Sequence, residues 1–112
     1  MAAFMIVMLR NRDAQWMADY VTHVPGILRK YGGEYVGVSK RIKQLEGIMP
    51  IPDGIAILRF PSAARIEEFM ACEEYRPYRE LRQGSSAADI LIFDAAPAPS
   101  VGGSRTGTPG AS

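Results

Sequence analysis

The chain has 112 residues, of which 47% are apolar and 22% are charged, and its formal net charge at pH 7 is +1. This composition is typical of one globular domain, and the balance of charges excludes a general attraction to nucleic acid or to anionic membranes. The single cysteine and single histidine exclude an intrachain disulfide and leave too few ligands for a structural zinc site.

The two ends of the chain bear on its location and its domain limits. The first apolar run, residues 2–9, is too short to span a bilayer and lacks the basic leader of a signal peptide. We therefore expect a cytoplasmic protein with no membrane partner. Residues 96–112 are rich in glycine, proline and serine and have little apolar bulk, so we expect a folded domain over residues 1–95 and a disordered tail after it.

A strand and a helix are predicted first. Residues Phe4–Leu9 are apolar at every position, which is typical of a strand covered on both faces. Apolar residues then recur at three- and four-residue steps from Trp16 to Tyr31, as on one face of a helix. We expect this helix to be capped by Asp13, to bend or restart at Pro25 and to end at Gly32-Gly33.

Two further strands follow in the sequence. Residues Glu34–Arg41 alternate in polarity and predict a strand, and a loop rich in proline and glycine extends from Leu45 to Gly54. Residues Ile55–Phe60 predict a third strand that is apolar on both faces apart from Arg59.

The second half of the pattern repeats the first. Ser62 is placed to cap a second helix whose buried face holds Ile66, Phe69 and Met70, and Pro77 suits the first turn of a short extra helix. Residues Ala88–Ala95 predict the last strand.

The order of these elements predicts the α+β fold called ferredoxin-like, βαββαβ, with a four-stranded antiparallel sheet. Two helices cover only one face of such a sheet, yet three of the strands are apolar on both faces. A second copy of the same sheet is the simplest cover for the other face, so we predict a homodimer that forms a dimeric α+β barrel.

Three stretches resemble a known family. They are VPGILRKYGGEYVG (24–37), Leu45-Glu46-Gly47, and ILRFPSAARIEEFMACEEYRPYRELR (57–82). Together they resemble the domain of unknown function 1330 (DUF1330). The resemblance implies a dimeric α+β barrel, related in fold to small antibiotic-biosynthesis monooxygenases, polyketide cyclases and muconolactone isomerase. It implies no single reaction, because that fold hosts many functions.

The motifs of cofactor and metal enzymes are missing from the sequence, which has no HExxH, CxxC, Walker A or GxSxG pattern. We therefore expect an enzyme without cofactor or metal that works by acid–base catalysis and positioning. Our leading hypothesis is a proton-transfer-driven isomerase or cyclase acting in biosynthesis on a small, partly apolar substrate that can carry a negative charge. The alternatives are a non-catalytic dimer that binds a small ligand, and a cofactor-free monooxygenase.

The predicted first helix supplies three candidate site residues, and the strand after it supplies a fourth. His23 lies at the edge of the apolar face of the helix, where it is either a general acid or base or a half-exposed surface residue. Tyr20 and Tyr35 are either core aromatics or donors to an enolate or carbonyl oxygen. Trp16 is either a packing residue or an aromatic wall for a ring-shaped ligand.

The remaining candidates bind an anion or stabilise the fold. Arg59 interrupts an apolar strand, so it either pairs with a carboxylate, such as a helix glutamate or Asp89, or binds a substrate anion. Tyr75 and Arg79 lie in a segment where arginines recur every third residue, at positions 76, 79 and 82. That row is either a solvated helix face or an anion site at the mouth of a pocket, and we select Tyr75 and Arg79 as substrate-binding candidates.

Overall fold

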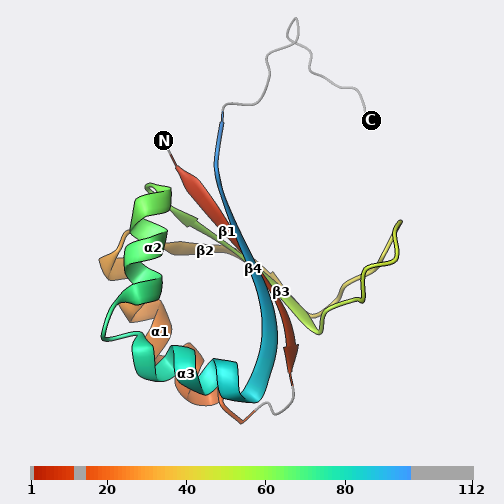
Figure 1. The fold of residues 1–112 in the computed structure, drawn as a ribbon, viewed down its shortest axis with the longest axis horizontal. Helices are drawn as coiled ribbons and strands as arrows, with labels where there is room; N and C mark the ends of the chain where they lie inside the picture. The colour runs from red at the N-terminus through yellow and green to blue at the C-terminus, as the bar shows by residue number, and fades with distance from the viewer. Residues whose placement is uncertain (1, 12–14, 97–112) are drawn as a thin grey trace, which may run out of the picture.

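The computed structural model describes residues 2–11 and 15–96, and it confirms the ferredoxin-like fold. Four antiparallel strands form one sheet in the order β2-β3-β1-β4, and three helices lie on one of its faces (Figure 1). The elements are β1 (Ala3–Asn11), α1 (Met17–Lys30), β2 (Glu34–Ser39), β3 (Gly54–Phe60), α2 (Ala63–Ala71), α3 (Arg76–Ser85) and β4 (Ser86–Asp94). The predicted cap Asp13 and residues 97–112 of the predicted tail lie outside the described residues.

Helix α1 begins later than predicted and does not restart at Pro25, whereas the alternative of a bend there stays a prediction. It begins at Met17, and Trp16 at its N-cap position makes no side-chain hydrogen bond to it. The helix also continues through Pro25 without a restart. The missing N–H of Pro25 removes one hydrogen bond, but Val24 and Leu28 on either side are fully buried, and their packing holds both halves in one helix.

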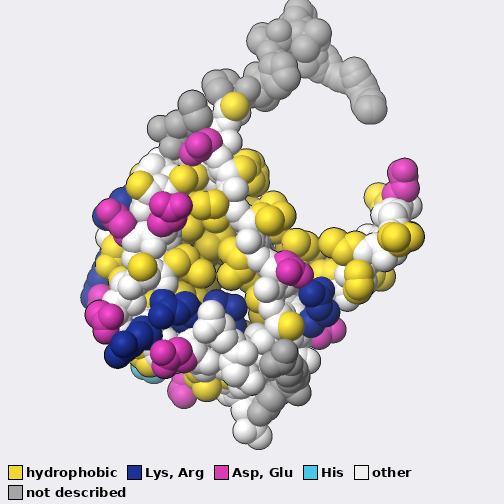
Figure 2. Space-filling model, in the orientation of Figure 1, with side chains coloured by type: hydrophobic (Ala, Val, Ile, Leu, Met, Phe, Trp, Pro, Cys, Tyr) yellow, Lys and Arg dark blue, Asp and Glu magenta, His cyan; other side chains and the backbone are white. Residues whose placement is uncertain are grey.

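The core lies between the sheet and the helices. Hydrophobic side chains fill this space in Figure 2. Its most deeply buried members come from all three helical segments and from the two central strands; they include Val24, Leu28, Ile66, Phe69, Tyr75, Met5, Leu58 and Phe60. Each such side chain contributes about 1.5–3 kcal/mol of burial free energy, so this layer accounts for most of the driving force for folding.

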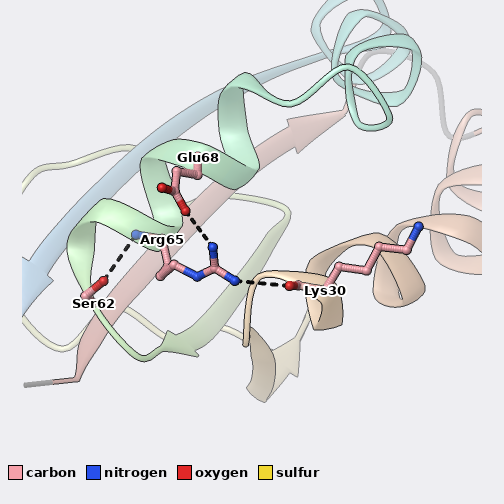
Figure 3. Close-up of polar contacts among 4 residues, drawn as sticks. All are labelled: Lys30, Ser62, Arg65 and Glu68. Atoms are coloured by element: carbon pink, nitrogen blue, oxygen red, sulfur yellow. Dashed lines mark hydrogen bonds and ion pairs between the residues drawn. The ribbon is translucent and has the colours of Figure 1, made fainter.

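Arg65 connects α2 to the end of α1 (Figure 3). The Ser62 hydroxyl caps α2 by accepting the Arg65 N–H at 3.2 Å, as predicted. The Arg65 guanidinium donates to Glu68 at 2.7 Å and to the backbone carbonyl of Lys30 at 3.2 Å, and it lies 5.2 Å from the Tyr31 ring centroid. The contact with the last turn of α1 fixes the position of one helix against the other.

The sheet face opposite the helices is uncovered and apolar at its centre. Direct cross-strand neighbours share a face, so Leu91, Ile6 and Ile57 form one apolar row across β4, β1 and β3. In the next row Phe93 stacks on Phe4, with ring centroids 5.6 Å apart. We call this surface the open face.

Charged pairs lie around this apolar centre, and one of them corrects a prediction. Arg59 is exposed on the open face, and its guanidinium lies 3.8 Å from the carboxylate of Glu34 on β2. It does not pair with a helix glutamate or with Asp89, which instead binds Arg10 at 2.8 Å. The reason is the alternation of β3, which directs Leu58 toward the helices and Arg59 away from them.

A long loop, residues 40–53, joins β2 to β3, and we call it the arm. It extends away from the domain on the side of the sheet opposite the helices (Figure 1). Its side chains Leu45, Ile48, Met49 and Ile51 are exposed, and Ile48 is 100% accessible. Gln44 donates to the carbonyl of Met49 at 2.7 Å across its turn. Of the helices described, none combines the length and the apolarity needed to cross a bilayer.

Candidate functional site

The best-formed cavity lies between α1 and the β2–β3 side of the sheet. It has a volume of about 270 Å³, and we call it the outer lobe. Its walls are largely apolar and come from β1, the first half of α1, β2 and β3; they include Val7, Leu9, Trp16, Met17, Tyr20, Val21, Pro25, Tyr35, Val38 and Ala56. Lys40 and Asp53, at the base of the arm, also line it. A cavity with these walls suits a small ligand that is mainly apolar.

A smaller cavity of about 60 Å³, the inner lobe, continues from the outer lobe toward α3. The two lobes share Val7, Tyr20, Tyr35 and Ala56 as walls, so we treat them as one chamber. The inner lobe adds the side chains of Tyr75 and Arg82. Both lobes are mainly apolar, and these two residues add polar groups to the inner one.

A pair of tyrosines forms the polar centre of the inner lobe. The hydroxyl oxygens of Tyr20 and Tyr75 lie 2.7 Å apart, within hydrogen-bond distance. Burial raises the pKa of Tyr20, and the proximity of Tyr75 raises it further. Burial also raises the pKa of Tyr35. Tyr20 and Tyr35 therefore stay protonated at neutral pH. In the Tyr20–Tyr75 pair, one hydroxyl hydrogen remains available after the two oxygens have bonded to each other.

Three buried polar atoms along the chamber have no hydrogen-bond partner among the residues that the structure describes. They are Arg82 Nε in the inner lobe, and Trp16 Nε1 and Asn11 Oδ1 in the outer lobe. Buried polar groups are nearly always paired in folded proteins, because leaving one unpaired costs about 1–3 kcal/mol. Two donors and one acceptor of this kind, on residues that line the chamber, therefore have no structural explanation within the described part of the chain.

Four of the predicted site residues meet in this chamber. Trp16, Tyr20 and Tyr35 line the outer lobe, and Tyr75 joins Tyr20 and Tyr35 in the inner lobe. Trp16 packs edge-on against Tyr20, with ring centroids 5.1 Å apart, so the aromatic residues form one connected wall.

His23, Arg59 and Arg79 lie elsewhere. The exposed His23 donates from Nδ1 to the carbonyl of Asp19 in its own helix at 2.9 Å and stacks on Tyr78. Arg59 is on the open face. Arg79 donates to the carbonyl of Met70 and lines a wide, shallow depression beside α2 and β4. The expected convergence of His23 and Arg59 with the tyrosines is thus not observed.

The chamber also contains residues that the sequence did not single out. Arg82 was recognised only as a member of the arginine row, and Asn11 and Asp53 were not considered. Residues three apart on a helix differ by about 60° in direction, so spacing alone did not show that Arg82 faces inward. Nothing in the sequence around Asn11 or Asp53 distinguishes them from ordinary residues at strand ends.

Comparison with known proteins identifies the family. The model described as Domain of unknown function (DUF1330) matches residues 2–96. The chain belongs to this family. Among proteins with curated descriptions, none matches this DUF1330 chain.

Solved structures share the fold of this DUF1330 domain at low sequence identity. RPA0582 from Rhodopseudomonas palustris, a protein of unknown function, is 19% identical with a TM-score of 0.74, covering 87% of this chain and 84% of its own. A variant of SnoaB, a cofactor-independent oxygenase from Streptomyces nogalater, is 10% identical with a TM-score of 0.62, covering 87% and 95%. A dimeric ferredoxin-like protein from Jannaschia sp. CCS1 is 11% identical with a TM-score of 0.63, covering 85% and 100%. These similarities establish the fold, and the function has to be argued from the chamber.

Proposed function

We propose that this chain is a cytoplasmic, cofactor-independent enzyme that isomerises or cyclises a small, partly apolar biosynthetic intermediate by proton transfer. The observation that carries the proposal is the Tyr20–Tyr75 hydroxyl pair at the end of an apolar chamber. A neutral phenol held in a site of low polarity is a strong donor to an oxygen on which negative charge develops. Removal of a proton next to a carbonyl group creates such an oxygen.

The proton acceptor in this proposal is Asp53. It is the only carboxylate among the described residues that line the chamber. One of its oxygens, Oδ2, accepts the backbone N–H of Asn11 at 2.9 Å, which fixes the side chain beside the outer lobe. His23, the proton-transfer group predicted from the sequence, lies outside the chamber, so the proposal gives this role to Asp53.

Deuterium exchange tests this chemistry without knowledge of the natural substrate. We would follow by NMR the exchange of the α-protons of 2-tetralone, a compact enolisable ketone, in D₂O with the full chain. Exchange should exceed the rate in buffer, and Asp53→Asn and Tyr20→Phe should each reduce the protein-dependent rate about 100-fold or more. Asp89→Asn is the matched control, because Asp89 pairs with Arg10 on the open face. Exchange no faster than in buffer would contradict the proposal.

The two alternative functions, an oxygenase and a non-catalytic binding protein, are each supported by one observation. The shared fold with SnoaB, described as a cofactor-independent oxygenase, favours an oxygenase, which requires oxygen uptake coupled to substrate loss. Trp16 Nε1 and Asn11 Oδ1, with which no described residue pairs, favour a bound ligand whether or not it reacts. A non-catalytic binding protein would show saturable binding with no product.

The proposed enzyme is a homodimer that forms through the open face. This face has the anatomy of an interface, because its apolar centre is bordered by the pairs Arg10–Asp89 and Arg59–Glu34. The arm extends on the same side of the sheet (Figure 1), where its exposed hydrophobic residues can pack against a second copy. The similar Jannaschia protein is itself described as dimeric.

Light scattering tests the homodimer. The wild-type chain should have twice the mass of the monomer, and Leu91→Asp should reduce it to the monomer mass, because the substitution puts a charge into the apolar row of Leu91, Ile6 and Ile57 on the open face. Leu81→Asp is the matched control, since Leu81 is a partly exposed leucine on α3. A wild-type monomer at micromolar concentration would refute the assembly.

A further inference from the structure

Arg82 is the most unusual charged group in the structure. Its side chain is only 5% exposed, and no described residue pairs with its charge. The other two arginines of the row differ, because Arg76 lies 3.5 Å from Glu73 and Arg79 donates to the carbonyl of Met70. A buried cation without a counter-ion is destabilising. The burial of Arg82 is therefore not explained by the stability of the fold.

The position of Arg82 is fixed by its surroundings. It lies in the last turn of α3, and the hydroxyl of Ser86 donates to its backbone carbonyl at 2.7 Å. Its side chain lines the inner lobe beside Tyr20 and Tyr75. The positive charge also opposes, as the smallest of the contributions, the rise in the pKa of Tyr20 that burial causes.

We infer that the inner lobe is an anion site in which Arg82, beside the Tyr20–Tyr75 pair, holds the ionised oxygen of a small ring-bearing acid. The inner lobe, about 60 Å³, has room for a carboxylate or a similar anionic group. The outer lobe, about 270 Å³ with mostly apolar walls, has room for the ring. No acidic residue among those described lines the inner lobe, so an entering anion meets no like charge there.

This inference deepens the proposed function, on which it rests for the chamber, by naming the class of substrate. A ligand with an ionised oxygen would supply a counter-ion for the Arg82 guanidinium, while the spare hydroxyl hydrogen of the tyrosine pair stays available to the carbonyl oxygen of the proposed reaction. A neutral ring of the same shape would leave the arginine unpaired. The predicted result is selectivity for the anion over its neutral isostere.

Trp16 makes the test simple, because it is the only tryptophan of the chain and it lines the outer lobe. Its fluorescence would be followed while the full chain is titrated with 4-tert-butylbenzoate and, separately, with the neutral 4-tert-butylbenzamide. The benzoate should bind about 10- to 100-fold more tightly, the range expected for hydrogen bonds to a charged group. Arg82→Gln should remove this preference, and Arg82→Lys should keep part of it. Arg76→Gln, in the same helix but paired on the surface, should leave it unchanged.

Each outcome separates the anion site from the proposed reaction. Equal affinity of the wild type for both compounds, no saturable binding of either, or a preference that survives in Arg82→Gln would overturn the inference. Tighter binding of the neutral compound than of the benzoate would overturn it while leaving the chamber and its chemistry intact. An Arg82-dependent preference without deuterium exchange would support the anion site and count against the enzyme. If Arg82→Gln fails to fold by circular dichroism, the selectivity of the wild type and of Arg82→Lys decides.

Discussion

Replacement of Tyr20 by phenylalanine should change how the stability of the protein depends on pH. At pH 7.5, Tyr20→Phe removes one buried hydrogen bond and leaves the Tyr75 hydroxyl, in a side chain only 2% exposed, without its partner. The expected loss in the free energy of unfolding is about 1–2 kcal/mol. This difference in the free energy of unfolding between the wild type and Tyr20→Phe should then decrease as the pH rises.

The decrease in this difference follows from the raised pKa of Tyr20 in the folded protein. In the unfolded chain the phenol ionises near pH 10, whereas in the folded protein it stays protonated above that pH. A raised folded pKa contributes stability that is complete below the unfolded pKa and is lost as the pH rises above it. By pH 11 the wild type should have lost about 1.4 kcal/mol from this group. The phenylalanine variant has no such loss, so its stability should come close to that of the wild type.

The assay is urea unfolding at pH 7.5 and pH 11, followed by circular dichroism and Trp16 fluorescence at one fixed protomer concentration. Val24→Ala is the control, because it creates a cavity in the same helix at a fully buried position but removes no ionisable group. Its deficit relative to the wild type should be the same at both pH values. If the deficit of Tyr20→Phe also stayed constant, the reasoning about the buried phenol would be wrong.

Three further predictions concern stability, measured as the thermal midpoint. Gly33→Ala should lower the free energy of unfolding by about 1–3 kcal/mol, because a Cβ there would collide with Leu28 Cδ1 and lie 2.6 Å from Phe60 Cζ; a midpoint drop below about 4 °C would contradict it. Gly26→Ala, with open space around it inside α1, should instead stabilise by about 0.5–1 kcal/mol. Ser62→Ala removes the cap of α2 and should cost about 0.5–2 kcal/mol; no change in midpoint would show that the cap contributes little.

The order and type of the elements could be read from the sequence because hydrophobic periodicity reports directly on them. The change from continuous apolar runs to three- and four-residue steps separated strands from helices, and Ser62 marked the start of α2 as the structure shows. A helix start without such a capping residue was harder to predict. Trp16 provides no side-chain cap for α1, and the predicted start was too early.

The site was only partly predictable, because side-chain direction depends on neighbours that the sequence does not place. Tyr20 and Tyr35 were found since both face the core. His23 lies about 60° around the helix from Tyr20, and what meets that edge is Tyr78 of the extra helix α3. Arg59 was read as part of a strand apolar on both faces, but the alternation of β3 takes it to the surface opposite the chamber.

Alternate residues of strand β1 contribute to two different surfaces of the domain. Its odd-numbered side chains, such as Met5 and Val7, border the chamber, while Phe4 and Ile6 belong to the open face. Substitutions at the odd-numbered positions could therefore change ligand specificity without affecting self-association, and substitutions at the even-numbered positions could do the reverse. Loss or gain of one residue in β1 would move each set of side chains to the opposite face of the sheet. Evolution can therefore substitute residues in this strand, but it cannot insert or delete one without disrupting both the chamber and the open face.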